Sequence, residues 1–295
     1  MVTCASQLSA ISRLFSSTVF REMAAKGRSA LFARLLRESA LTKCDSSLRR
    51  VGDAFETAFA ILRARGYRDE YTYKAALTHK VLLGTHSLRT ASMMTEFRVG
   101  ECKADLVILN GTATVYEIKS ERDSLSRLQK QIEAYRKVFA RVFVIAGQKH
   151  VEAVVASTST DVGVMCLSKR HQISTVRDAE HRPDRICPVA VFEALRTNEA
   201  KQILEGLGYS LPKLPNTVLY AELRERFGSL LSSDLHFEMV RTLKRTRNLM
   251  PLTRLVDGLP PSLQAAALSV SVRKNDHERL IGAVNTPLRE AIGWV

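Results

Sequence analysis

The stretch ADLVILNGTATVYEIKSERD, residues 104–123, carries charged side chains within two otherwise apolar runs. Asp105 stands near the start of the first run, a turn follows at Asn110-Gly111, and the second run ends in Glu117-Ile118-Lys119. Charged groups are rarely buried without partners, so their place beside a predicted core needs an explanation. The stretch therefore predicts either a charged functional site or a strand pair with one solvated face.

Counting residues across two predicted hairpins places the acids side by side. The segments 93–99, 104–110 and 112–119 have the alternation of short strands, with hairpin signals at Gly100-Glu101 and Asn110-Gly111. A two-residue loop at Gly100 pairs Glu96 with Asp105, and a three-residue loop at Asn110 pairs Asp105 with Glu117. Lys119 then lies on the same face. A two-residue loop at Asn110 would turn Asp105 to the other face, so the prediction requires an odd loop or a bulge.

Three neighbouring carboxylates would repel one another and raise one another's pKa values. A divalent cation removes this repulsion, and hard oxygen ligands suit Mg²⁺ or Mn²⁺. The ammonium of Lys119 beside such a cation suits a site that handles phosphate. In metal-free protein, removal of one acid from the row should then be neutral or mildly stabilising, whereas removal of one partner from a core ion pair would be costly.

The remaining periodicities predict an α/β fold with the order α-β-β-β-α-β and a mixed central sheet. Helical spacing covers 53–65 and 70–83, and Ser124 is expected to cap a helix with the apolar face Leu125, Leu128, Ile132, Tyr135 and Phe139. A buried strand follows at 141–147, then a hairpin of 163–168 and 173–177. A composition change at 181–188 predicts three segments: a basic helical segment 1–50, the α/β core 51–180, and a mostly helical C-terminal domain 189–295.

Composition indicates a soluble protein with a polyanionic partner. The formal net charge of +14 favours nucleic acid, with an anionic membrane surface as the second choice. No apolar run approaches the ~20 residues that span a bilayer, so we expect no membrane insertion. The five cysteines are scattered, without zinc-type spacing, which predicts reduced thiols in the cytoplasm.

These residues resemble the PD-(D/E)xK nuclease superfamily, whose core is restriction-endonuclease-like. Asp105 matches the motif's acid, although Ala104 stands where the motif has Pro, and Glu117 and Lys119 match E-x-K. The segment QIEAY, 131–135, matches the Q-x-x-x-Y element of one branch. The stretches TASMMTEFRVGECKADLVILNG and EIKSERDSLSRLQKQIEAY also resemble an uncharacterised bacterial family whose members are often encoded near phage or other mobile elements.

The resemblance implies roles for the matching residues. Asp105, Glu117 and the backbone carbonyl of Ile118 would bind Mg²⁺ or Mn²⁺, while Lys119 would position or deprotonate the attacking water. The superfamily often has a further acid, for which Glu70 and Glu96 both qualify. Gln131 and Tyr135 would support the site from the following helix.

Two basic segments are candidates for nucleic-acid binding, although basic surfaces without function are equally common. Arg122 lies in SERD, 120–123, close to the predicted site. The segment RTLKRTRNLMPLTR, 241–254, has five basic residues and no acid, and could follow a phosphate backbone through Arg241, Lys244, Arg245 and Arg247.

Sequence reasoning thus predicts a metal-dependent nuclease that hydrolyses phosphodiester bonds, in a phage-related or defence context. DNA is favoured over RNA because most members of the superfamily cut DNA. One alternative is a nucleic-acid-binding module with a nuclease fold and no activity of its own. Another is a toxin or defence component gated by a partner, which the C-terminal domain could bind.

Overall fold

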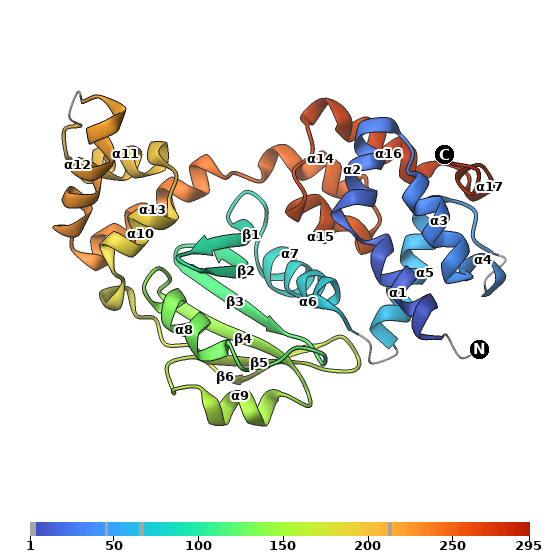
Figure 1. The fold of residues 1–295 in the computed structure, drawn as a ribbon, viewed down its shortest axis with the longest axis horizontal. Coiled ribbons are helices and arrows are strands. Elements are labelled where there is room, and N and C mark those ends of the chain that lie inside the picture. Colours follow the sequence, from blue (N-terminus) through green and yellow to red (C-terminus); the bar gives the residue numbers. More distant parts are fainter. Residues whose placement is uncertain (1–3, 45–46, 65–67, 212–213) are drawn as a thin grey trace. The chain divides into compact units, whose positions relative to one another are not determined.

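The protein is described by a computed structural model that covers residues 4–44, 47–64, 68–211 and 214–295. The chain divides into two compact units (Figure 1). Unit 1 comprises Met1–Val81, Lys169–Gln172 and Met250–Val295, and unit 2 comprises Leu82–Ser168 and Ile173–Leu249. Each unit is described by itself.

Unit 1 is helical. Its N-terminal helices confirm the predicted basic helical segment, and Gly27, with φ of 71°, ends one helix before the next begins. Its helices are α1 (Ala5–Leu14), α2 (Ser17–Lys26), α3 (Ala30–Ser39), α4 (Leu41–Cys44), α5 (Val51–Ala64), α6 (Glu70–Leu77) with the π-helical continuation Thr78–Leu82, α14 (Thr253–Asp257), α15 (Pro261–Ser269), α16 (His277–Asn285) and α17 (Leu288–Ala291), with short 3-10 turns at Met250–Leu252 and Lys274–Asp276.

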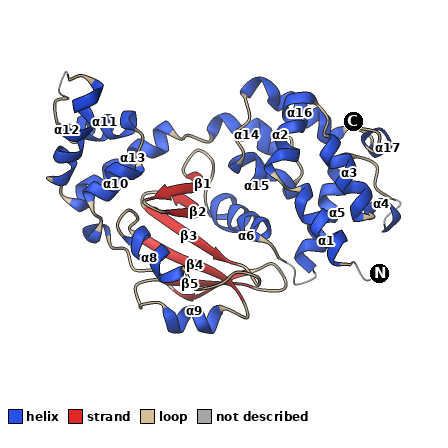
Figure 2. Cartoon of the chain, in the orientation of Figure 1, coloured by secondary structure: helices blue, strands red, loops and turns tan. Residues whose placement is uncertain are grey.

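Unit 2 is built on a six-stranded mixed sheet in the order β1-β2-β3-β4-β5-β6 (Figure 1), whose strands are red in Figure 2. The pairs β3–β4 and β4–β5 are parallel, and the other three pairs are antiparallel. This sheet confirms the predicted α/β class. Its strands are β1 (Ser92–Val99), β2 (Cys102–Leu109), β3 (Ala113–Lys119), β4 (Arg141–Gly147), β5 (Gly163–Leu167) and β6 (Ile173–Arg177).

The predicted hairpin registers are confirmed at both turns. Val99 pairs with Cys102 across a two-residue loop, and Leu109 pairs with Ala113 across the three-residue loop Asn110-Gly111-Thr112. The odd loop closes through a hydrogen bond from the Asn110 N–H to the Thr112 carbonyl oxygen, at 3.1 Å. Gly111 has φ of 96° and Gly100 has φ of 56°, values that glycine adopts without steric cost.

The helices of unit 2 differ in two details from the sequence-based expectation: the start of α8 and the presence of α9 (Val151–Ser157). Ser124 does not cap α8, because its hydroxyl accepts from the N–H of Ser126 in a turn and the helix begins at Leu128. Its helices are α7 (Leu83–Thr85), α8 (Leu128–Arg136), α9 (Val151–Ser157), which was not predicted, α10 (Pro188–Ala194), α11 (Thr197–Gly206), α12 (Asn216–Gly228) and α13 (Ser232–Thr246), with a 3-10 turn at Pro183–Arg185. None of the helices described is long and apolar enough to cross a bilayer.

The boundaries of the two units differ from those of the predicted segments. The helices of 1–50 belong to the same unit as those of 51–81, and the predicted C-terminal domain is shared between the units at Leu249 and Met250. As expected, the described part of 189–295 is helical and adds no strand to the sheet. The assignment of 51–180 as the nuclease core stays a prediction.

A buried histidine links α13 to the turn between β2 and β3. The Thr112 hydroxyl oxygen lies 3.0 Å from Nε2 of His236 and 3.0 Å from Nε2 of His181. The side chain of His236 is fully buried, and this burial, with His181 beside it, lowers the pKa of His236 to about 4. His236 is therefore neutral at physiological pH.

We predict an acid-dependent loss of stability at His236. The folded pKa of about 4 lies below the unfolded value of roughly 6.5, so the unfolded chain binds more protons between these values. The contribution of neutral His236 to the free energy of unfolding is complete above pH ~6.5. As the pH falls toward ~4, this contribution is lost and the free energy of unfolding decreases by roughly 1–3 kcal/mol. Urea unfolding of the wild type and His236→Gln across this range measures it. Parallel pH profiles for the two proteins would contradict the prediction.

Candidate functional site

Glu117 and Lys119 form a buried ion pair at the end of β3. The two residues are 2% and 5% exposed, and Nζ of Lys119 lies 2.8 Å from Oε1 of Glu117. Residues two apart in a strand lie on one face, so the E-x-K spacing itself allows this contact. The strand presents both groups to α8, which supplies the remaining polar partners.

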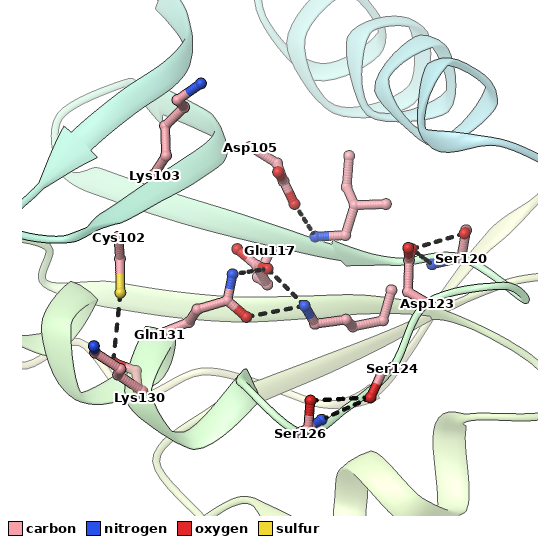
Figure 3. Close-up of polar contacts among 12 residues, drawn as sticks. Cys102, Lys103, Asp105, Glu117, Ser120, Asp123, Ser124, Ser126, Lys130 and Gln131 are labelled. Atoms are coloured by element: carbon pink, nitrogen blue, oxygen red, sulfur yellow. Dashed lines mark hydrogen bonds and ion pairs between the residues drawn. The ribbon is translucent and has the colours of Figure 1, made fainter.

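Gln131 joins the two charges from α8. Its amide nitrogen donates to Oε1 of Glu117 at 2.5 Å, and its amide oxygen accepts from Nζ of Lys119 at 2.9 Å (Figure 3). One neutral side chain thus satisfies both members of the pair, which lowers the cost of burying them. The predicted proximity of Gln131 to the acid is confirmed.

Tyr135, one turn further along α8, holds the second oxygen of Glu117. Its hydroxyl donates to Oε2 at 2.8 Å and also lies 3.0 Å from the carbonyl oxygen of Lys103. Burial, reinforced by the adjacent Glu117 carboxylate, raises the pKa of Tyr135 above its usual range. The phenol therefore remains a proton donor and fixes the orientation of the carboxylate.

Asp105 reaches the same segment of β3 from β2. The β2–β3 ladder ends at Leu106 and Tyr116, one position before the predicted pair of Asp105 with Glu117. Instead, Oδ2 of Asp105 accepts from the backbone N–H of Ile118 at 2.7 Å, in the peptide that joins Glu117 to Ile118 (Figure 3). The predicted row of three paired carboxylates is thus corrected: Asp105 binds the main chain of β3, while Glu117 is paired with Lys119.

Glu96 lies opposite Asp105 on β1, as predicted, but in an unusual conformation. The pairs on either side of it are Thr95 with Leu106 and Phe97 with Ala104. Its φ of 56° is left-handed, which costs a non-glycine residue roughly 1–2 kcal/mol. A carboxylate oxygen of Glu96 lies within 4.8 Å of one of Asp105, and Lys103 Nζ is 2.7 Å from Oε2 of Glu96.

Two further candidates from the sequence are Glu70, in unit 1, and Arg122, in unit 2. Glu70 opens α6 in unit 1, where its carboxylate lies 2.6 Å from Nζ of Lys74. Arg122 is exposed in the loop between β3 and α8. The choice between Glu70 and Glu96 as the extra acid stays a prediction.

The four basic candidates at 241–247 divide into two groups. Arg241, Lys244 and Arg245 are on the partly or fully exposed side of α13. Arg247 is instead a structural residue: it binds both carboxylate oxygens of Glu199 at 2.7 and 2.8 Å, and its guanidinium lies 5.1 Å from the ring centre of Phe97. We therefore leave Arg247 out of any nucleic-acid surface.

Sequence reasoning missed two contributors to this region. Lys103 is paired with Glu96, and its carbonyl oxygen contacts Tyr135. The hairpin register pairs Lys103 with Arg98. Glu96 lies two residues before Arg98 on the same face of β1, so the register already placed Lys103 close to Glu96. Glu199, the partner of Arg247, had no local signal, because 48 residues separate the two.

The oxygen donors fit a hard divalent cation in chemical type. Asp105 and Glu96 are on neighbouring strands with carboxylate oxygens within 4.8 Å, and Asp105 contacts the peptide that follows Glu117. Mg²⁺ typically uses one or two carboxylates and retains several waters, so two neighbouring carboxylates match the ligand type and number that it uses. The arrangement defines an α/β protein with a buried acid–lysine pair next to a more exposed pair of acids.

Comparison with known proteins places the chain in a phage-related family. The model of the family described as Bacteriophage P4 protein cII matches residues 63–248, and the chain belongs to this family. It is 30% identical over 149 residues to "Protein cII" of Enterobacteria phage P4, an alignment that covers 49% of this chain and 54% of that protein. The chain thus spans about half the length of this curated relative.

A solved structure of a protein of unknown function from Silicibacter pomeroyi is also similar. It shares 17% sequence identity, with a TM-score of 0.28, over 41% of this chain and 85% of the other. This level of likeness carries no argument about function.

We predict that Glu96→Gly stabilises the protein or leaves its stability unchanged. Glycine adopts the observed φ without strain, which offsets its larger entropy loss on folding. The matched control is Arg98→Gly in the same strand, at an exposed position without positive φ, which should cost roughly 0.5–1 kcal/mol. Thermal unfolding of both variants tests this, and an equal loss in both would show that Glu96 is not strained.

We also predict that the Glu117–Lys119 pair behaves as a buried ion pair in metal-free protein. Glu117→Ala should cost about 3–5 kcal/mol, because it leaves the Lys119 ammonium buried without its carboxylate. This reverses the sequence-based expectation of a neutral effect. The double change Glu117→Leu with Lys119→Met should recover most of the loss.

Urea unfolding in EDTA gives the required free energies. The matched control is the exposed pair Glu101–Lys130 in the same unit, whose single Ala variants should unfold like the wild type. Additive effects of the Glu117 and Lys119 changes would contradict a coupled pair.

Proposed function

We propose that this protein is a metal-dependent nuclease that hydrolyses phosphodiester bonds in nucleic acid, with DNA as the first choice. The observation that carries the proposal is the contact between Asp105 and the Ile118 N–H, at 2.7 Å. It joins an acid on β2 to the segment of β3 that bears Glu117 and Lys119. The same segments carry the sequence resemblance to the PD-(D/E)xK superfamily and its restriction-endonuclease-like core.

In this proposal the metal ligands come from neighbouring strands of unit 2. Asp105 on β2, Glu117 and the carbonyl of Ile118 on β3 would hold Mg²⁺ or Mn²⁺, with Glu96 on β1 as a further acid. When bound, such a cation polarises the phosphate and lowers the pKa of a coordinated water. The strain at Glu96 supports a functional role, since strained residues cluster at functional sites.

Lys119 would act on the attacking water. Its Nζ is held by Glu117 and Gln131, so it is oriented before substrate arrives. From this place it would direct the water toward phosphorus and offset the negative charge that develops as the phosphorus–oxygen ester bond breaks. Tyr135 donates a hydrogen bond to Oε2 of Glu117 and thereby keeps Oε1 turned toward Lys119.

The polyanionic partner follows from charge. The net charge of +14 favours nucleic acid, and Arg241, Lys244 and Arg245 provide exposed or half-exposed cations on α13. The loop residue Arg122 is a further candidate for phosphate binding near the site. The family membership supports a phage-related setting, and a protein partner for the C-terminal helices belongs to the same proposal.

A second function is a nucleic-acid-binding module without catalysis. One observation favours it: Glu117 already accepts three hydrogen bonds, from Lys119, Gln131 and Tyr135. A fully satisfied ion pair can serve structure alone. In that case neither Asp105 nor Glu117 would bind a cation, and the basic surface would remain the functional part. A partner-gated enzyme would instead bind the cation and cut only with its partner.

The nuclease proposal predicts separable effects at Asp105 and Lys119. Asp105→Asn keeps an oxygen for the Ile118 N–H but loses a charged ligand, so Mn²⁺ binding and cleavage should both fall at least tenfold. Lys119→Met should retain Mn²⁺ binding while cleavage falls at least a hundredfold. Isothermal calorimetry with Mn²⁺ and a gel assay of DNA cleavage measure the two quantities.

The matched control is Glu101→Gln, which removes an exposed carboxylate from the same unit and should change neither quantity. Circular dichroism confirms that each variant is folded. Equal Mn²⁺ affinity in the wild type and Asp105→Asn would show that the cation binds elsewhere and would contradict the proposed site.

A further inference from the structure

The outer side of α13 combines one aromatic side chain with a run of cations. Phe237 is 55% exposed, and Arg241, Lys244 and Arg245 follow it at the spacing of one and two helical turns. The opposite side of the helix is buried, through residues such as Leu235, Met239, Val240 and Leu243. We call Phe237, Arg241, Lys244 and Arg245 the α13 stripe.

Two of the cations are held in place while their charge remains accessible. Nε of Arg241 lies 2.9 Å from Oε2 of Glu238, yet 64% of the Arg241 side chain is exposed. Arg245 donates to the amide oxygen of Gln202 on α11 at 2.9 Å. Groups fixed in this way lose less side-chain entropy on binding than mobile surface cations do.

A cavity lies next to the Arg245 end of the stripe. It measures ≈470 Å³ and is lined by Arg196, Thr197, Asn198, Glu199, Gln202 and Thr246. Gln202 belongs both to its wall and to the contact with Arg245. The stripe is therefore flanked by amide and hydroxyl groups that can form hydrogen bonds with a strand held on the cations.

We propose that the α13 stripe binds single-stranded nucleic acid, with a base stacked on Phe237 and the backbone on Arg241, Lys244 and Arg245. The inference rests on the proposed function and names its substrate class. Cations alone would serve a duplex equally well, because they contact phosphates. An exposed ring adds affinity only where an unpaired base can lie on it, which a stacked duplex does not offer without being distorted.

The acids around the stripe do not oppose this assignment. Glu238 is largely buried and is engaged by Arg241 and Thr242, so its charge is compensated. Glu199, in the cavity wall, is neutralised by Arg247. Asp234, in the first turn of α13, is the exposed acid of the helix and lies N-terminal to Phe237.

The test measures binding without cleavage. Fluorescence anisotropy in EDTA compares a labelled single-stranded DNA, the same sequence as RNA, and the corresponding DNA duplex. Phe237→Ala should weaken single-strand binding about five- to 150-fold and leave duplex binding and the salt slope nearly unchanged. Phe237→Trp should retain single-strand binding, because it keeps a stacking surface.

Further variants separate the stacking role of Phe237 from the role of the cations and from a general effect of losing an exposed aromatic ring. Tyr220→Ala removes an exposed aromatic from α12 and should leave binding unchanged. Replacement of Arg241, Lys244 and Arg245 by Ala should make the negative slope of log affinity against log salt shallower by about 2. The charge control is Arg34→Ala, an exposed helical Arg paired with Glu38, as Arg241 is paired with Glu238.

The outcomes distinguish this inference from the nuclease proposal. Equal single-strand affinity in the wild type, Phe237→Ala and Phe237→Trp would overturn the stacking role, even if the protein cuts DNA. Equal losses for single strand and duplex in Phe237→Ala would overturn the substrate class. A selective loss in Phe237→Ala would support the inference even if no substrate were cleaved with any metal.

Discussion

The buried contact between Glu117 and Lys119, at 2.8 Å, constrains the rest of unit 2. Two charges at 2% and 5% exposure lose most of their hydration, and the Coulomb attraction alone does not reliably offset that loss. The structure offsets it with hydrogen bonds from Gln131 and Tyr135 on α8. Both side chains reach Glu117 only if α8 lies over β3 at one position and in one orientation. These hydrogen bonds therefore fix how α8 packs on the sheet.

The ion pair by itself is compatible with a structural role and with a catalytic role, and the residues around it distinguish the two. An ion pair whose only purpose was structural would need neither the acid on β2 that binds the next peptide nor a strained acid opposite it. Asp105 and Glu96 supply both features, at a cost in backbone strain and in charge repulsion. A cation would offset the repulsion, and this is why the cluster, rather than the pair alone, supports a catalytic proposal.

Much of this arrangement follows from local sequence. The three-residue loop at Asn110 and the spacing of Gln131 and Tyr135 are set by residues close in the chain, and the structure has both as expected. The left-handed backbone at Glu96 could not be predicted, because it depends on the neighbouring strand and not on the residue type. Arg247 was misjudged because its partner Glu199 is on another helix, far away in sequence. The start of α8 was placed early because a Ser turn resembles a helix cap.

The most direct test of the central claim is the action of the wild-type chain of 295 residues on a panel of nucleic acids. Linear, circular, single-stranded and branched DNA, together with RNA, would be incubated with Mg²⁺, with Mn²⁺ and with EDTA. The account predicts cleavage of at least one substrate with a divalent cation and none in EDTA. Intact substrates under every metal condition, together with no detectable binding of Mn²⁺ by calorimetry, would contradict it.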